Sequence, residues 1–321
     1  MAQVHFKRYL AIATLIGAFL GGCGGSQSGT AIPPAVTNTP AASSTAQTDD
    51  ATRLSAPHFL TSGKYCDGPN DVNLQLQAID NVESGFRMEN PQKSLEEIIR
   101  LGNGLVVFAR FPGSIVDIFV PGADKPVLIN ETQGYSLGAG YFVTTNHGLA
   151  DVVSSQGSGY PLEIFADRLL LSYGTAEGNF SSLVQNVAAL PEADLGLVYM
   201  PLAAESPKGF RSSSTLKKGE TVYNITLSDS GPVVRTGEVI EISVGATAKD
   251  YPVSYSGQVL TSITAGDGDS GSPVFDSSGK LVGVVSVGSV LNGSPATTVA
   301  SIGYLGDILS IQKRQLKSCE W

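Results

Sequence analysis

The chain has 321 residues, of which 42% are hydrophobic, 15% are charged and 37 are glycine. This composition excludes a largely disordered chain, which would carry more charge and less apolar surface, and is typical of a turn-rich folded protein. The 20 basic and 29 acidic residues leave a net charge of −9. An acidic chain argues against nucleic acid as a partner, because nucleic-acid-binding proteins present a basic surface.

Residues 1–22 have the features of a targeting signal. Lys7 and Arg8 precede an apolar run, Tyr9–Leu20, that is too short to span a bilayer. The run ends in LGGC, which resembles the bacterial lipobox, where cleavage precedes a cysteine that is then lipidated. We therefore expect Cys23 to carry a lipid that anchors the mature chain in the bacterial cell envelope. The alternative is an ordinary secretory signal or a short membrane anchor, and in either case the chain leaves the cytoplasm.

Residues 23–57 combine this cysteine with a tether of Ser, Thr, Ala, Gly and Pro that cannot form a core. Residues 58–99 form an N-terminal extension that contains Cys66 and a predicted helix in NPQKSLEEIIRL, residues 90–101. In an oxidising compartment we expect Cys66 to pair with Cys319, the alternative being two free buried thiols. Zinc is disfavoured, because the few cysteines and histidines fall at no ligand spacing.

From residue 103 the sequence breaks into short apolar or alternating runs separated by Gly, Pro, Asn and Asp. Runs of this kind predict an all-β barrel or sandwich. The predicted strands lie in GLVVFARF, SIVDIFV, GYFVTTN, LEIFADRLLLSY, DLGLVYM, ETVYNITL, VVRTGEVIEISV, SYSGQVLTSI, KLVGVVSVG and TTVASIGYL. One late segment, LGDILSIQKRQLKS at residues 305–318, has apolar residues near the helical period and predicts a C-terminal helix.

The segment TAGDGDSGSPVF, residues 264–275, is compatible with three kinds of site. Its three glycines match the G-x-G-x-x-G spacing of a dinucleotide site, but Pro273 and a predicted β-hairpin follow where that site requires a helix. Its two aspartates are typical calcium ligands, yet no third ligand and no distal Glu fall at EF-hand positions. The third interpretation, a nucleophilic Ser270, depends on finding a base and an acid elsewhere.

Only one histidine is placed to act as that base. His5 lies in the signal and His58 at the edge of the tether, which leaves His147 in the β-rich region. No histidine follows Ser270, and this excludes the serine, acid, histidine order of the α/β-hydrolases. The order that remains is His147, then an acid, then Ser270.

Three segments in this order resemble the trypsin-like serine proteases. GAGYFVTTNHGLAD is similar to the strand-end histidine segment of the family, EADLGLVYM to its acid and following apolar strand, and GDSGSPVF to its nucleophile loop. The acid is then Asp194, 47 residues after His147 and 76 before Ser270. The resemblance covers about residues 100–312. It implies an all-β fold of two six-stranded antiparallel β-barrels packed together with a C-terminal helix, and we assign residues 100–321 to this domain.

The resemblance also implies a function, that of a serine endopeptidase with protein or peptide substrates, an acyl-enzyme intermediate and no cofactor or metal. Ser270 would be the nucleophile, His147 the general base, and Asp194 would fix the imidazole tautomer. The backbone N–H groups of Gly268 and Ser270 would form the oxyanion hole. The alternative is a catalytically inactive binding or adhesion module, since fold does not imply function.

The primary substrate pocket of the family can be carried over by offset from the nucleophile. The residues placed there are Thr264, Ala265, Ser286, Val287 and Gly288. An uncharged Thr264 argues against cleavage after Lys or Arg, and Val285 stands where the similar glutamyl endopeptidases have a histidine. We therefore expect a broad preference for small or medium uncharged side chains before the cleaved bond.

Two further positions bear on how the site is completed. Ser272 replaces a glycine that many family members have. Asp269 corresponds to the aspartate that pairs with a newly cut N-terminus in zymogen-type relatives. Cleavage after Arg100 would supply such a terminus, but the LGNGL that follows is unlike the usual apolar start, and bacterial relatives often need no cut. The sequence leaves activation open.

Overall fold

The computed structural model describes residues 61–62, 69–86, 104–110, 130–152, 162–165, 168–175, 178–201, 215–228, 231–247 and 254–319. Several sequence predictions lie outside these ranges and stay predictions. They are the signal over residues 1–22, the lipidated Cys23, the tether, Cys66, the helix over residues 90–101 and the strand in SIVDIFV.

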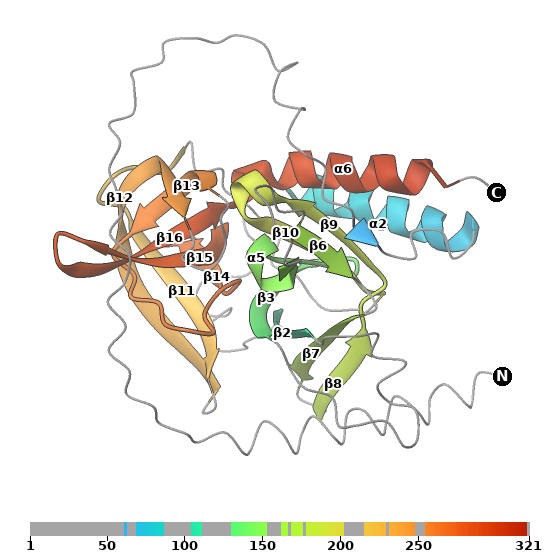
Figure 1. Cartoon of the computed structure of the whole chain (residues 1–321), viewed down its shortest axis with the longest axis horizontal. Coiled ribbons are helices and arrows are strands. Elements are labelled where there is room, and N and C mark those ends of the chain that lie inside the picture. Colours follow the sequence, from blue (N-terminus) through green and yellow to red (C-terminus); the bar gives the residue numbers. More distant parts are fainter. Residues whose placement is uncertain are drawn as a thin grey trace, which may run out of the picture.

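The first half of the fold is an antiparallel sheet of seven strands (Figure 1). In sheet order the strands are β8 (Gly178–Leu183), β7 (Leu169–Thr175), β2 (Leu105–Arg110), β3 (Asn130–Gly138), β4 (Tyr141–Thr145), β10 (Leu195–Tyr199) and β9 (Asn186–Leu190). A small sheet accompanies it, in the order β1 (Thr61–Ser62), β6 (Leu162–Phe165) and β5 (Asp151–Val152). The strands β4, β9 and β10 are buried along their whole length.

The second half is a closed antiparallel barrel of six strands. In barrel order they are β11 (Thr221–Ser228), β12 (Gly231–Thr247), β13 (Ser254–Thr261), β16 (Ser294–Ser301), β15 (Leu281–Leu291) and β14 (Pro273–Asp276). Pairing of β11 with β14 closes the barrel, with Tyr223 opposite Phe275. Its interior is filled mainly by valines, which suit strands because their branched side chains pack well on a pleated surface.

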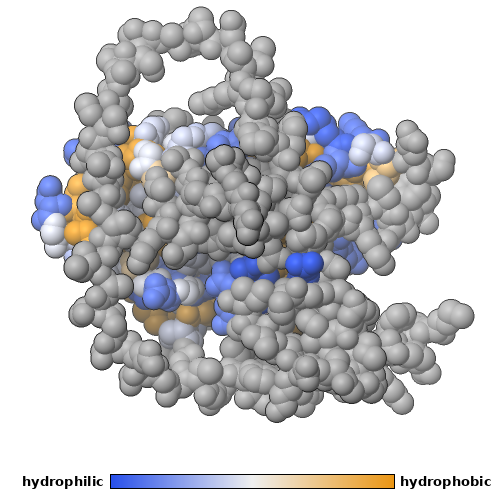
Figure 2. Space-filling view, viewed as in Figure 1, coloured by the Kyte–Doolittle hydropathy of each residue, from blue (hydrophilic) through white to orange (hydrophobic). Residues whose placement is uncertain are grey.

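Two long helices lie side by side along the first sheet (Figure 1). They are α2 (Pro69–Phe86) and the predicted C-terminal helix α6 (Leu305–Lys317). Ile79 of α2 and Ile308 of α6 are fully buried in one apolar cluster that also includes residues of both sheets. The visible outer edge above α6 is largely hydrophilic (Figure 2). The helix pair therefore has a polar outer side and an apolar inner side, as expected for amphipathic helices that cover a core.

Polar contacts reinforce this helix pair. Lys313 of α6 forms ion pairs with Asp80, at 3.0 Å, and with Glu83, at 2.9 Å. The buried amide of Gln75 in α2 accepts a hydrogen bond of 2.9 Å from the side chain of Asn186 at the start of β9. A covalent bond also holds the residues that follow α6, because Cys319 is disulfide-bonded. Its expected partner, Cys66, is not among the described residues, so that pairing stays a prediction.

The predicted fold class is confirmed, with two differences in detail. The first sheet contains seven strands among the described residues rather than six, and α2 was not predicted. The apolar residues of α2 do not form one regular helical stripe, because Ile79 and Val82 are buried whereas Leu74 is 57% exposed. Within the described part of the chain, no helix is both long and apolar enough to cross a membrane.

Candidate active site

The base and the acid of the predicted site come from neighbouring strands of the first sheet. Strand β4 ends at Thr145, which pairs with Leu195, the first residue of β10. His147 follows β4 in the short helix α5 (Asn146–Leu149), and Asp194 directly precedes β10. Because the two strands are antiparallel, both side chains leave the same edge of the sheet. The structure therefore brings together two residues that are far apart in sequence.

Asp194 is held by the turn that precedes its strand. The 3-10 helix η3 (Pro191–Ala193) ends there, and Asp194 adopts a left-handed conformation with φ of 53° and ψ of 37°. Aspartate is among the few non-glycine residues enriched in this region. Gln258 on β13 donates a hydrogen bond of 2.8 Å to the carbonyl of Ala193, so the second barrel supports this turn.

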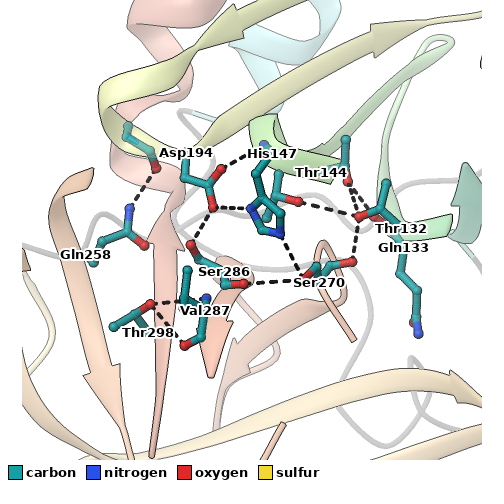
Figure 3. Close-up of polar contacts among 12 residues, drawn as sticks. Thr132, Gln133, Thr144, His147, Asp194, Gln258, Ser270, Ser286, Val287 and Thr298 are labelled. Carbon is teal, nitrogen blue, oxygen red and sulfur yellow. Dashed lines mark hydrogen bonds and ion pairs between the residues drawn. The ribbon is translucent and has the colours of Figure 1, made fainter. Parts of the chain in front are cut away.

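The carboxylate of Asp194 is fully buried and accepts three hydrogen bonds (Figure 3). Oδ1 accepts from the backbone N–H of His147 at 3.0 Å, and Oδ2 accepts from Nδ1 of the same residue at 2.8 Å. The hydroxyl of Ser286 on β15 donates to Oδ2 at 2.5 Å. A buried charge needs such partners. Because Nδ1 carries the proton that faces Asp194, the lone pair of Nε2 points away from the acid.

Two opposing influences act on the pKa of His147. Burial disfavours the imidazolium and lowers the pKa, whereas the charge of Asp194 and its hydrogen bond stabilise the imidazolium and raise it. The net result is a pKa above the ordinary value of 6.5. The imidazole is therefore a stronger base than a free histidine, and it loses that role when the pH falls below its pKa.

Ser270 lies where the free lone pair of His147 points (Figure 3). Its Oγ is 3.1 Å from Nε2, and it also lies 3.4 Å from the carbonyl oxygen of Ser286. The Ser270 carbonyl accepts hydrogen bonds from the backbone N–H of Gln133, at 2.7 Å, and from the hydroxyl of Thr132, at 2.8 Å. The nucleophile loop of the second barrel is thus tied to strand β3 of the first sheet.

Gly271 shows why this contact requires a glycine. It has a φ of +84°, and a Cβ built on it would lie 1.8 Å from the carbonyl oxygen of Gln133. Neither the conformation nor the space would accept a side chain. The glycine that follows Ser270 therefore allows the loop to approach the first sheet.

The residues before the nucleophile form a tight turn. The N–H of Asp269 donates to the carbonyl of Gly266 at 3.2 Å, and Gly268 has a φ of +86° while Asp267 does not have a positive φ. A turn with a positive φ only at its third residue is of type II. Among the described residues, the N–H groups of Gly268 and Ser270 have no hydrogen-bond acceptor. The nucleophile loop thus offers two backbone donors, one from Ser270 itself and one from Gly268, as an oxyanion hole requires.

Asp269 has its own partners inside the barrel. Its buried carboxylate accepts hydrogen bonds from Thr226 at 2.6 Å and from the backbone N–H of Gly266 at 2.6 Å. It also forms an ion pair with the guanidinium of Arg235 on β12. The cation that neutralises this aspartate therefore comes from the middle of the chain. This arrangement bears on the question of activation that the sequence leaves open.

Ser272, the departure from the family pattern, also has a defined partner. It is fully buried, and its hydroxyl accepts a hydrogen bond of 2.8 Å from the side chain of Asn224 on β11. The same amide donates to the carbonyl of Pro273 at 3.0 Å. Serine at this position thus joins the end of the nucleophile loop to the neighbouring strand.

The predicted pocket residues lie on two segments that face each other. Thr264 and Gly288 are exposed, and Ala265 is half-buried. A Cβ built on Gly288 would lie 3.9 Å from the carbonyl oxygen of Ala265, so Gly288 faces that segment and any side chain on it would narrow the space between them. The hydroxyl of Thr297 on β16 holds the opposite segment, because it donates to the carbonyl of Ile263 at 2.6 Å and accepts from the N–H of Ala265 at 3.2 Å.

Two other predicted pocket residues have their polar groups engaged within the protein (Figure 3). The hydroxyl of Ser286 is directed at Asp194. The backbone N–H and carbonyl of Val287 each lie 3.2 Å from the hydroxyl of Thr298. Ser286 thus contacts the site at two points, through its hydroxyl to the acid and through its carbonyl to Ser270.

Several residues of the site were not predicted. They are Thr132, Gln133, Thr226, Arg235 and, as a partner of the acid, Ser286. The polar segment NETQGYSLG of β3 was not predicted to be a strand, although Thr132, Gln133 and Ser136 in it are buried. A short polar run directly before a predicted apolar strand was the only signal. The part of the chain that the structure describes contains no group of three or more His, Cys, Asp or Glu that could hold a metal ion.

Comparison with known proteins supports a family resemblance. Residues 127–284 match the family model described as a trypsin-like peptidase domain. No curated protein matches the sequence.

Three similar solved structures share low sequence identity with the chain. Deg5 is 18% identical, with 64% of this chain and 86% of that chain covered and a TM-score of 0.45. The protease domain of MamO from Magnetospirillum magneticum, in its apo form, is 16% identical, with 64% and 96% covered and a TM-score of 0.44. Rv3671c from M. tuberculosis H37Rv, an inactive form with a serine-to-alanine substitution, is 16% identical, with 68% and 90% covered and a TM-score of 0.45.

Proposed function

We propose that this protein, whose residues 127–284 match the model of a trypsin-like peptidase domain, is a serine endopeptidase whose catalytic residues are His147, Asp194 and Ser270. The observation that carries the proposal is the chain of hydrogen bonds from Asp194 Oδ2 to His147 Nδ1, at 2.8 Å, and from Nε2 to Ser270 Oγ, at 3.1 Å. Protein or peptide substrates follow from the peptidase domain itself.

The proposed reaction proceeds through an acyl-enzyme. Nε2 of His147 accepts the proton of Ser270 while Oγ forms a bond to the carbonyl carbon of the substrate, and the carbonyl oxygen becomes an oxyanion. The imidazolium then donates its proton to the leaving amine, and the C–N bond breaks. Water attacks the ester in a second round of the same proton transfers. Asp194 stabilises the imidazolium in both rounds without itself taking the proton.

The oxyanion would be bound by the N–H groups of Gly268 and Ser270. Both belong to the loop that is held by the Gly266–Asp269 turn on one side and by strand β3 on the other. The positive φ of Gly268 fixes the central peptide of a type II turn, which determines the direction of its N–H. Such preorganised donors are worth about 3 kcal/mol of activation free energy each.

Activation by a new N-terminus is not required in this proposal. In zymogen-type relatives the aspartate next to the nucleophile pairs with the ammonium group of a newly cut N-terminus. Here Asp269 already accepts hydrogen bonds from Arg235, Thr226 and Gly266. The chain should therefore be active without cleavage near Arg100. Mass analysis of the active protein, showing an intact peptide across that position, would test this point.

The proposed specificity follows from the exposed Thr264 and the open position of Gly288. Neither carries a charge, which favours small or medium uncharged side chains before the cleaved bond, with a broad preference. Cleavage profiling on a peptide library tests this part. Dominant cleavage after Lys, Arg or Glu would show that the pocket assignment is wrong.

We further propose that the mature chain begins at a lipidated Cys23 and acts in the bacterial cell envelope. The support is the LGGC that follows the apolar run of the signal. Fractionation of cells that express Cys23→Ser tests it, since the variant should leave the membrane fraction. A variant that stays membrane-bound would contradict the lipid anchor.

The test of the catalytic proposal is the hydrolysis of a denatured protein substrate by wild type, Ser270→Ala and His147→Ala. Both variants should lose nearly all activity, because residues of a catalytic triad act as a unit. Ser84→Ala, which alters an exposed serine on α2, is the matched control and should keep full activity. Full activity of Ser270→Ala would end the proposal.

A further inference from the structure

One buried side chain next to the site links three parts of the molecule. Gln133 lies on β3 of the first sheet and is 5% exposed. Its Nε2 donates to Thr226 Oγ1 at 2.8 Å and to the carbonyl of Gly268 at 2.9 Å, and it also lies 3.2 Å from the carbonyl of Leu227. Its Oε1 accepts from the N–H of Leu227 at 2.8 Å. A side chain of the first sheet therefore contacts both strand β11 and the nucleophile loop.

These contacts fix one peptide unit of that loop at both ends. In the peptide unit between Gly268 and Asp269, the carbonyl accepts a hydrogen bond of 2.9 Å from Nε2 of Gln133. Its N–H donates a hydrogen bond of 3.2 Å to the carbonyl of Gly266. A peptide unit is planar, so two anchored ends leave it little freedom to rotate. The N–H groups of Gly268 and Ser270 belong to the peptide units on either side of it.

The backbone of Gln133 adds a second anchor beyond the nucleophile. Its N–H donates to the carbonyl of Ser270 at 2.7 Å, and its own carbonyl accepts from Thr144 at 2.5 Å. The side chain and the backbone of Gln133 thus form hydrogen bonds to the loop on either side of the Ser270 N–H, at the carbonyls of Gly268 and Ser270. The same β3 strand pairs with β4, which leads into His147. Movement of the loop relative to the base is therefore restricted by Gln133.

We propose that Gln133 is a positioning residue, whose side-chain amide holds the Gly268 and Ser270 N–H groups in the direction that binds the oxyanion. The inference rests on the proposed function. Gln133 would act through the loop and would not itself touch the substrate. The amide suits this role because it offers donors to Gly268 and Thr226 and an acceptor to Leu227, so its buried polar groups are satisfied.

The test uses three substitutions in the full chain. Gln133→Met keeps the length and removes the hydrogen bonds, Gln133→Glu replaces the Nε2 donor by an acceptor, and Gln133→Asn keeps an amide that is one methylene too short to reach Gly268. The matched control is Gln75→Met, which removes a buried amide contact of 2.9 Å between α2 and Asn186, away from the loop.

The readouts are kcat, KM and the affinity for a peptide aldehyde, whose hemiacetal forms an oxyanion on Ser270, compared with the affinity for the matching peptide acid. Loss of one oxyanion donor lowers kcat by about 10²–10³-fold, so loss of its support should lower kcat by about 10- to 100-fold. We expect KM and the affinity for the peptide acid to stay within about threefold, and the affinity for the aldehyde to fall in parallel with kcat. Gln75→Met should keep kcat.

Each outcome decides the inference. A kcat within twofold of wild type in Gln133→Met, or an unchanged affinity for the aldehyde, would overturn it. If the three Gln133 variants fail to fold while Gln75→Met folds, Gln133 is a structural residue and the inference is again wrong. A wild-type chain that hydrolyses no peptide bond under any condition would instead overturn the proposed function, and this result is distinct from the others.

Discussion

The two halves of the molecule hold their parts of the site in different ways. In the first sheet, His147 and Asp194 follow and precede fully buried strands, and each contacts the other directly. In the second barrel, Ser270 lies in a loop between β13 and β14, where Gly266, Asp267 and Gly268 are exposed. Pairing of β4 with β10 brings the acid and the base together, and Gln258 and Ser286 of the barrel add hydrogen bonds to the acid and its turn. The nucleophile has no such support and is placed by contacts from outside the loop.

This difference shows where the site is sensitive to remote changes. Burial and strand pairing place the acid and the base, so changes at those two residues should have the largest effect on them. The loop depends on Gln133 and Thr132 from the first sheet and on Arg235 and Thr226 from the barrel. Residues that never meet the substrate should therefore affect catalysis through the loop.

The largest effect is expected in the first sheet, from Asp194→Asn. An amide cannot accept the Nδ1 proton in the same way and favours the wrong imidazole tautomer, so kcat should fall by about 10⁴-fold with the fold intact. Steady-state kinetics and a urea denaturation curve measure the two quantities. Glu192→Gln, two residues earlier in η3, is the control and should keep kcat. A loss below tenfold would show that Asp194 is not the orienting acid.

The next effect is expected in the barrel, from Arg235→Met. The substitution leaves the buried charge of Asp269 without its cation, which loosens the turn before the nucleophile and should lower kcat by about 100-fold. The pH profile of the remaining activity should not move, because the His147–Asp194 pair is unaltered. Lys218→Met, which breaks an exposed ion pair with Glu241 on β12, is the matched control. Unchanged kcat in Arg235→Met would show that the nucleophile loop does not depend on this remote residue, contrary to the difference described between the two halves.

A smaller effect is expected at Ser286, where the two halves meet. Because Asp194 raises the pKa of His147, kcat/KM of the wild type should fall as the pH drops, with a midpoint above 6.5. Ser286→Ala removes a donor from Asp194, which strengthens its attraction for the imidazolium, so this midpoint should move to higher pH. The lost hydrogen bond to a charged group should lower kcat by about tenfold. A midpoint below 6.5 in the wild type would contradict the description of the base.

The smallest effects on activity are expected in the helix pair, where stability changes instead. Ile79→Ala removes a fully buried side chain and should lower the free energy of unfolding by about 2–5 kcal/mol. Lys313→Met breaks ion pairs with the exposed Asp80 and the partly exposed Glu83 and should cost less than about 1 kcal/mol. Urea denaturation measures both. Loss of kcat at temperatures where Ile79→Ala is folded would show that α2 acts on the site.

The same contrast explains what could be predicted from the sequence. The apolar runs predicted most strands, including β4 and β10, and the motifs around His147, Asp194 and Ser270 predicted residues that the structure brings within hydrogen-bond distance. Contacts between distant segments leave no local pattern. Arg235 is one of three charged residues in β12, and Gln133 lies in a polar run that was not predicted as a strand, so neither could be recognised before its partners were known.

Covalent labelling distinguishes a Ser270 nucleophile that is activated by His147 from an unreactive serine. The wild-type chain is treated with a fluorophosphonate, digested and analysed by mass spectrometry, beside Ser270→Ala and His147→Ala. We expect a single phosphonylated peptide that contains Ser270, no label in Ser270→Ala and labelling slowed by orders of magnitude in His147→Ala. Absence of label on folded wild-type protein, or equal labelling of Ser270→Ala, would contradict it.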